Sequence, residues 1–239
     1  MSWERVKFKE LYAIASKNGI YKSSEFHGHG SKIVNMGELF AYGFVGSQDM
    51  RRIAVDEKEK KSFGLEEGDL LFARRSLVES GAGKASIVRN LTESTVFESS
   101  IIRVRLKKEI CNPLFYYYWL KSYDGISEIS ALVNGVNVKG IKSSALKEIC
   151  VVLPDMSVQN RISEILYNYD QLIENNQKQI KLLEEAAQRL YKEWFVDLHF
   201  PGYEDAKVVD GVPEGWEKGV LGDGCIDVKG QGIKVHKMS

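Results

Sequence analysis

The sequence lacks the features of a membrane protein, of a secreted protein and of a strongly basic nucleic-acid binder. Its apolar runs are far shorter than the roughly 20 residues of a membrane span. Charged residues recur from Glu4 onward and leave no apolar segment of a signal peptide near the start. The only cysteines, Cys111, Cys150 and Cys225, are widely scattered, so we expect reduced thiols in a cytoplasmic protein. Lys+Arg and Asp+Glu are equal in number, at 33 each.

The charges are distributed unevenly along the chain. Residues 1–154 contain 23 Lys+Arg against 18 Asp+Glu, an excess of +5. Residues 155–200 contain 5 against 8, and residues 201–239 contain 5 against 7. The excess is modest, but it places any affinity for a polyanion in the first segment.

Residues 1–154 are predicted to form a mixed α+β domain, because short runs rich in β-branched residues are broken by Gly, Ser and Asn. Asn112 followed by Pro113 is a helix-start signal, and the aromatic run after it predicts a buried helix over residues 112–122. The predicted strands are Ser31–Met36, Asp69–Arg74, Ser86–Arg89, Thr95–Leu106 and Glu148–Leu153.

Residues 155–200 contain neither proline nor glycine, which predicts one long helix of roughly 60 Å. Apolar residues recur at alternating spacings of three and four, the pattern of a coiled-coil seam. A seam of that length needs a partner helix, and the alternative is a helix packed along its own domain. The predicted helix-pairing residues are Ile162, Leu166, Tyr169, Ile173, Asn176, Ile180, Leu183, Ala187, Leu190 and Trp194.

The rest of the chain begins with a linker punctuated by Pro and Gly, residues 201–215. Residues 216–218 (WEK) then repeat residues 3–5 (WER) at an offset of 213 residues, and residues 232–233 repeat residues 19–20 at the same offset. The same order directly after a linker predicts that a second copy of the first domain begins here.

Several stretches resemble the specificity subunits of type I restriction–modification systems. They are IKSSALKEICVVLP (141–154), QNRISEIL (159–166), LEEAAQRLYKEWFVDLHFPGYE (183–204) and VPEGWEKGVLGD (212–223). GDLLFARR (68–75), followed by GAGKASIV (81–88), also resembles the recognition domains of this family. The resemblance covers nearly the whole chain.

The resemblance implies a function and a set of partners. Members of the family alternate two recognition domains, each reading half of a split double-stranded DNA target, with two helical regions that pair and dock methyltransferase subunits. It implies that S-adenosylmethionine is held by the methyltransferase subunit and no cofactor by this chain, and that a restriction subunit joins the full complex. Because the second domain stops early, we expect a half-length or truncated subunit that forms a homodimer through the long helix.

Loop residues of the first domain supply the side chains suited to DNA contact. Arginine pairs with guanine or phosphate, asparagine with adenine, and lysine with phosphate. Strand alternation sends only one of Arg74 and Arg75 toward any one surface, and for each candidate an ordinary solvated loop is the alternative. The expected DNA-binding residues are Lys22, Ser23, Ser24, Arg74, Arg75, Lys84, Asn137 and Lys139.

No catalytic or metal-binding set is apparent in the sequence. The run 81–86 (GAGKAS) has Val78 where a nucleotide-binding loop needs glycine. The run 112–115 (NPLF) has leucine where amino-methyltransferases of DNA have a second proline. His27 and His29 have no cysteine or carboxylate at the spacing of a zinc site, so we expect no bound metal. Since the other motifs also fail, we expect no catalytic activity in this chain.

The sequence therefore predicts a β-rich α+β recognition domain over 1–154, a coiled-coil-type helix over 155–200, and a linker with the start of a second domain over 201–239. The favoured function is the non-catalytic DNA-recognition subunit of a type I restriction–modification complex. The alternative is a protein-interaction adaptor that acts through the long helix without reading DNA. A steep salt dependence of DNA binding distinguishes the two.

Overall fold

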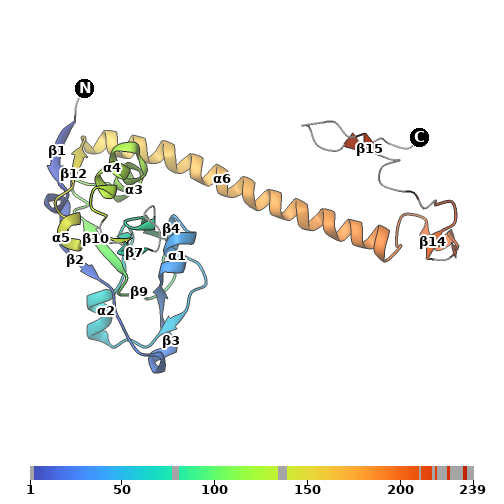
Figure 1. Ribbon diagram of the computed structural model, residues 1–239, viewed down its shortest axis with the longest axis horizontal. Helices are drawn as coiled ribbons and strands as arrows, with labels where there is room; N and C mark the ends of the chain where they lie inside the picture. The colour runs from blue at the N-terminus through green and yellow to red at the C-terminus, as the bar shows by residue number, and fades with distance from the viewer. Residues whose placement is uncertain are drawn as a thin grey trace. The chain divides into compact units, whose positions relative to one another are not determined.

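The computed structural model describes residues 3–76, 81–133, 139–209, 211–216, 219, 225–226 and 234–235. They belong to two compact units, Met1–Gln171 and Leu172–Ser239. Strands and short helices mix in the first unit, which confirms the predicted α+β class (Figure 1). Within these residues, no helix combines the length and the apolar character that crossing a membrane requires.

The first unit is built around a five-stranded sheet with the strand order β2-β10-β6-β8-β4. Neighbouring strands are antiparallel except for β4 and β8, which run parallel. The strands are β2 (Tyr12–Asn18), β10 (Ile101–Leu106), β6 (Leu70–Ala73), β8 (Ala85–Arg89) and β4 (Phe44–Gly46). Predicted strands 69–74 and 86–89 are thus confirmed as β6 and β8.

A three-stranded sheet with the order β5-β3-β9 lies in the same unit, and the first strand of the chain pairs with the strand that precedes the long helix. β3 (His27–Val34) runs antiparallel to β5 (Arg52–Ile53) and parallel to β9 (Thr95–Phe97). β1 (Glu4–Lys7) pairs antiparallel with β12 (Cys150–Leu153), as Figure 1 shows.

Two of the predicted strands differ from the structure. The run Thr95–Leu106 forms two strands of different sheets, because a turn closed by the Ile101 N–H donating to Glu98 O (3.0 Å) separates β9 from β10. The strand predicted at Ser31–Met36 begins at His27 and ends at Val34, since Met36 starts a helix.

Short helices connect the strands, and a side chain caps the start of some of them. The Asn112 side chain accepts a hydrogen bond from the Leu114 N–H (2.9 Å), so the predicted helix start is confirmed. Asp56 caps the helix Glu57–Phe63 in the same way, because its side chain accepts a hydrogen bond from the Glu59 N–H (2.7 Å). The elements are η1 (Phe8–Leu11), η2 (Ser24–Phe26), α1 (Met36–Ala41), α2 (Glu57–Phe63), α3 (Pro113–Lys121), α4 (Tyr123–Ser130) and α5 (Ser143–Leu146).

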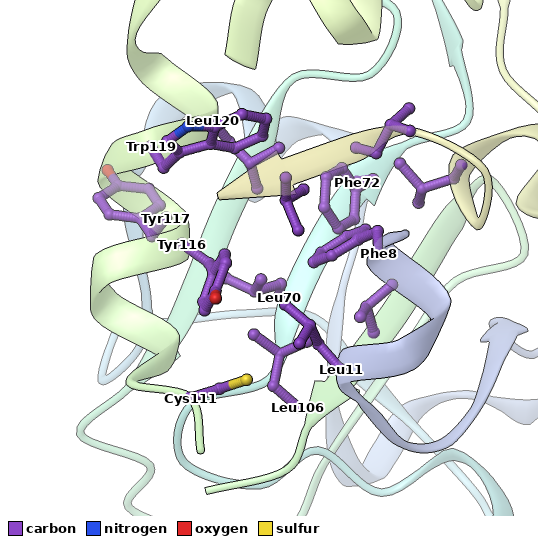
Figure 2. Close-up of a cluster of buried hydrophobic side chains, with 14 of the residues drawn as sticks. Phe8, Leu11, Leu70, Phe72, Leu106, Cys111, Tyr116, Tyr117, Trp119 and Leu120 are labelled. Atoms are coloured by element: carbon purple, nitrogen blue, oxygen red, sulfur yellow. The ribbon is translucent and has the colours of Figure 1, made fainter. Parts of the chain in front are cut away.

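Both faces of the central sheet are buried. Leu70 and Phe72 of β6 pack into a cluster with residues of α3, and Figure 2 shows Phe8 and Tyr116 gathered around them. Leu71, which points to the opposite face, belongs to a second cluster on the side of α1. The central strand is therefore apolar throughout, as expected for a strand covered on both faces.

The long helix α6 (Met156–Tyr191) begins in a polar contact with the first unit. The side chain of Gln159 is completely buried. It accepts a hydrogen bond from the Asn112 N–H (2.8 Å) and donates to Ile110 O (3.0 Å) and Pro154 O (2.8 Å). One amide thus satisfies three backbone groups at the point where β12, α3 and α6 meet.

Aromatic side chains continue this attachment for the next turns of α6. Tyr167 packs edge-on against Phe44 (5.7 Å between ring centroids), and the Arg89 guanidinium lies 4.7 Å from its ring centroid. The Tyr118 hydroxyl donates to Asp170 Oδ2 (2.8 Å). Burial, together with the hydrogen bond to Asp170, raises the pKa of Tyr118 above its ordinary value.

In the second unit, α6 ends beside a cluster of aromatic side chains. A π-helical turn over Lys192–Val196 follows α6, and Leu198 then adopts a positive φ of 62°, which breaks the helix before the predicted end at Phe200. Trp216 packs on Phe195 (5.7 Å) and Phe200 (5.3 Å). The first residue of the predicted repeat is therefore held against the end of the helix.

Short elements complete this second unit. The unit boundary falls inside α6, whereas the sequence suggested domain boundaries at 154/155 and 200/201; that domain division stays a prediction. The elements are η5 (Tyr203–Asp205), β13 (Val208–Val209), β14 (Val212–Pro213), β15 (Cys225–Ile226) and β16 (Lys234–Val235).

Replacing Gln159 by alanine should destabilise the first unit by about 1–3 kcal/mol, because backbone groups buried beside it lose their partners. Chemical denaturation followed by circular dichroism measures the change. The matched control is Gln177→Ala on the exposed part of α6, expected to alter stability by no more than about 0.5 kcal/mol. Equal effects of the two substitutions would contradict the role given to the buried amide.

Candidate nucleic-acid interface

A two-stranded ribbon brings together two of the segments predicted to contact DNA. β7 (Arg75–Ser76) pairs antiparallel with β11 (Lys139–Gly140), with Ser76 opposite Lys139 and Arg75 opposite Gly140. The ribbon is anchored at Arg74, whose N–H donates to Ser100 O (2.8 Å) and whose carbonyl accepts from the Ile141 N–H (3.0 Å). Segments far apart in the sequence thus meet at one place on the surface.

The two arginines at the end of β6 have different surroundings. Arg74 is half-buried, and its Nη1 donates to Ser99 O at 3.4 Å. Arg75 is exposed on β7, and its side chain makes no hydrogen bond or ion pair within the described part of the chain. The alternation expected for a strand therefore leaves Arg75 as the arginine available to a partner.

The structure describes the expected DNA-binding residues of the segment 137–139 only in part. Lys139 lies in β11, but its side chain is outside the described residues. Asn137 is also outside them, as is Val78.

The glycines of the loop 81–84 serve the packing of the domain itself. Gly83 has a φ of 77°, and a Cβ there would lie 2.3 Å from Ile129 Cγ2. Its N–H donates to Ala73 O (2.8 Å). The missing side chain of Gly83 therefore makes room for Ile129 of α4.

Lys84, at the end of this loop, is exposed and reaches α1. Its ammonium group donates to Phe40 O (2.8 Å) and lies 5.5 Å from the Phe40 ring centroid. A cation at the last carbonyls of a helix is favourable. A phosphate bound by Lys84 would therefore have to share its ammonium group with Phe40 O.

The early loop presents its predicted contact residues unequally. The Lys22 ammonium donates to Glu59 Oε2 (2.6 Å) and to Ala54 O (2.8 Å), and its side chain is largely covered. The Ser23 hydroxyl donates to Glu25 Oε1 (2.6 Å). Ser23 and Ser24 are both exposed, and Ser24 also lines a surface hollow, so Lys22 is the least accessible of the three.

Arg51 is a candidate contact that the sequence reasoning did not select. It is exposed, lines the same hollow as Ser24, and makes no side-chain hydrogen bond or ion pair within the described residues. The neighbouring Arg52 is bound by Glu93, with distances of 2.7 and 2.9 Å. Two consecutive arginines were the signal in the sequence that could have pointed to this site. Only the pairing of β5 with β3, however, brings Arg51 to the same hollow as Ser24.

The row of α6 side chains predicted to pair with another helix is exposed over most of its length. Leu183, in the second unit, exposes 69% of its surface. At the other end of the row, Ile162 is half-buried and packs against the core of the first unit, so this position serves the domain itself. Trp194 is half-buried, and the remaining members, Leu166, Tyr169, Ile173, Asn176, Ile180, Ala187 and Leu190, are exposed.

Among the described residues, no three His, Cys, Asp or Glu side chains come together as a metal-binding group. Several charged groups of the first unit instead form ion pairs with one another. Arg105, for example, donates to both carboxylate oxygens of Asp69 (2.7 Å each).

Comparison with known proteins identifies the family. The type I restriction modification DNA specificity domain matches residues 1–185, and the chain therefore belongs to this family. The specificity subunit of the type I restriction enzyme MjaIX from Methanocaldococcus jannaschii is 27% identical over 233 residues, which cover 92% of this chain and 51% of that protein. The EcoKI specificity subunit from Escherichia coli is 26% identical over 161 residues, covering 65% and 33%.

A solved structure shares the fold. The S subunit of a type I restriction–modification system from M. genitalium superposes with a TM-score of 0.56 at 18% identity, covering 82% of this chain and 46% of that one. The chain spans about half the length of the curated relatives that it matches over most of its own length. Family and fold predicted from the sequence are thus confirmed.

The packing role of the glycine loop predicts a selective effect of Gly83→Ala. The substitution should destabilise the first unit by more than about 1 kcal/mol, because the positive φ and the contact with Ile129 both oppose a Cβ. Gly37→Ala is the control, since Gly37 lies in α1 with no atom within 4 Å of the added Cβ; it should stabilise by about 0.5–1 kcal/mol. Thermal unfolding of both variants measures this, and a neutral Gly83→Ala would refute the packing role.

Proposed function

We propose that this chain is a sequence-specific DNA-recognition subunit of a type I restriction–modification complex. The match of residues 1–185 to the DNA specificity domain carries this proposal. One recognition domain reads one half of a bipartite target, and the chemistry resides in other subunits. The relatives are named specificity subunits, which supports a non-catalytic role.

The β7–β11 ribbon is the proposed centre of base reading. A two-stranded ribbon fits the major groove, and an arginine there pairs bidentately with guanine O6 and N7. Arg75 is the residue proposed for that contact, and its exposure on the ribbon supports the proposal. The other proposed DNA-binding residues are Lys22, Ser23, Ser24, Arg74, Lys84, Asn137 and Lys139, of which those with intramolecular partners serve as positioning or phosphate contacts.

The exposed row on α6 is the proposed pairing surface. A long line of exposed apolar side chains is typical of a surface that another protein covers. A second copy of this chain fits it, because two copies paired by a two-fold axis supply two recognition domains and two complementary seams. The same helical pair is proposed to dock the methyltransferase subunits.

Selection from a pool of randomised DNA duplexes tests base reading. The wild-type chain should enrich a defined half-site, and the double variant Arg74→Gln/Arg75→Gln should lose that preference, at a cost of about 1–3 kcal/mol for a bidentate contact. Arg161→Gln/Arg189→Gln, which removes two positive charges from exposed positions of α6, is the control and should keep the preference. If the wild type binds no DNA and yet forms helix-mediated complexes, the adaptor function is correct instead.

Light scattering at micromolar concentration tests the pairing surface. The wild-type chain should show the mass of a dimer, and Leu183→Glu should weaken the dimer at least roughly tenfold, because each seam would bury an unpaired charge. Gln177→Glu, a substitution outside the predicted seam, should leave the dimer intact. A wild-type chain with the mass of a monomer would contradict homodimerisation.

A further inference from the structure

β3 contains a local interruption that shapes the surface beside it. His27 and Ser31 are both paired with Ile53 of β5, so the residues between them leave the ladder. Gly28 and Gly30 have φ values of 101° and 92°, a conformation that glycine adopts without strain. Arg52 Nη1 donates to Gly30 O (2.9 Å) and fixes the displaced backbone.

A hollow of about 700 Å³ lies beside this interruption. Its floor includes the buried Met50, and a Cβ built on Gly28 would have no atom within 4 Å, so the backbone is approachable from outside. The lining residues are Ser24, His27, Gly28, Met50, Arg51 and Arg52. The hollow thus combines a small apolar floor with hydroxyl, imidazole and guanidinium groups.

The charges around the hollow leave one cation without a partner. Arg52 is bound by both carboxylate oxygens of Glu93, and this hydrogen bond lowers the pKa of Glu93. Arg51 has no such partner within the described residues. Asp49 is exposed nearby but does not line the hollow. Arg51 is therefore the group available to an anion.

We propose that this hollow binds a phosphodiester of the DNA backbone, with Arg51 as its cation. A hollow accepts a ridge of its partner, and the ridge of duplex DNA is the sugar–phosphate backbone. Met50 offers an apolar floor to the sugar, and Ser24 and His27 offer polar groups beside the phosphate. This proposal rests on the proposed function and adds a contact that positions the duplex without reading its sequence.

The salt dependence of DNA binding tests the site. Fluorescence anisotropy with a mixed-sequence duplex, at roughly 50 to 300 mM salt, gives the slope of log K against log[salt]. Arg51→Gln should reduce the magnitude of that slope by about 0.9, the value for one phosphate contact in duplex DNA. Arg51→Lys, which keeps the charge, should retain the wild-type slope.

Matched variants and a second readout separate this site from the ribbon. Arg161→Gln removes an exposed arginine of α6 and should leave the slope unchanged. The half-site selected by Arg51→Gln from a randomised pool should equal that of the wild type, whereas loss of base preference would assign Arg51 to base reading. Asp49→Asn should raise the affinity several-fold, because one repelling charge is removed.

The outcomes distinguish this proposal from the function on which it rests. A wild-type slope for Arg51→Gln, in a chain whose wild type binds DNA with salt dependence, overturns the phosphate site alone. An equal loss for Arg51→Gln and Arg161→Gln also overturns it, because the effect would then be one of net charge. Absence of salt-dependent DNA binding by the wild type overturns the proposed function, and the phosphate site with it.

Discussion

The buried amide of Gln159 is the contact on which the rest of the first unit depends. Its three hydrogen bonds join the end of β12, the segment before α3 and the first turn of α6. An amide can satisfy donor and acceptor groups at once, which a hydrophobic side chain of the same size cannot. Tyr167 and Asp170 extend the attachment along the helix. These contacts attach the first turns of α6 to the rest of the first unit.

The charges show why a modest basic excess says little about where DNA binds. Lys32 is largely covered and donates to Gln48 O, and Arg105 is bound by Asp69. Lys22 is likewise held by Glu59. These cations stabilise the fold. Arg75 and Arg51 are exposed cations whose side chains have no such partner within the described residues. They lie in different places, on β7 and beside the hollow, so the proposed interface has a base-reading ribbon and a separate backbone contact.

Local chemistry made part of this structure predictable. The Asn112 cap, the strands β6 and β8 and the long helix follow from signals within a few residues of each element. The environments of the site residues did not follow, because they depend on partners distant in sequence. Lys22 meets Glu59 only after β3 pairs with β5, and Gly83 meets Ile129 only after α4 packs. Ile162 fits a heptad seam equally well, yet the core beneath α6 covers it.

In the proposed assembly, each chain contributes one recognition domain, and paired α6 helices set the distance between two of them. Hydroxyl-radical footprinting of the chain on its selected duplex tests this most directly. The proposed assembly should give two protected patches, related by two-fold symmetry and separated by an unprotected spacer. A single continuous patch, or a duplex with no protection, would contradict it.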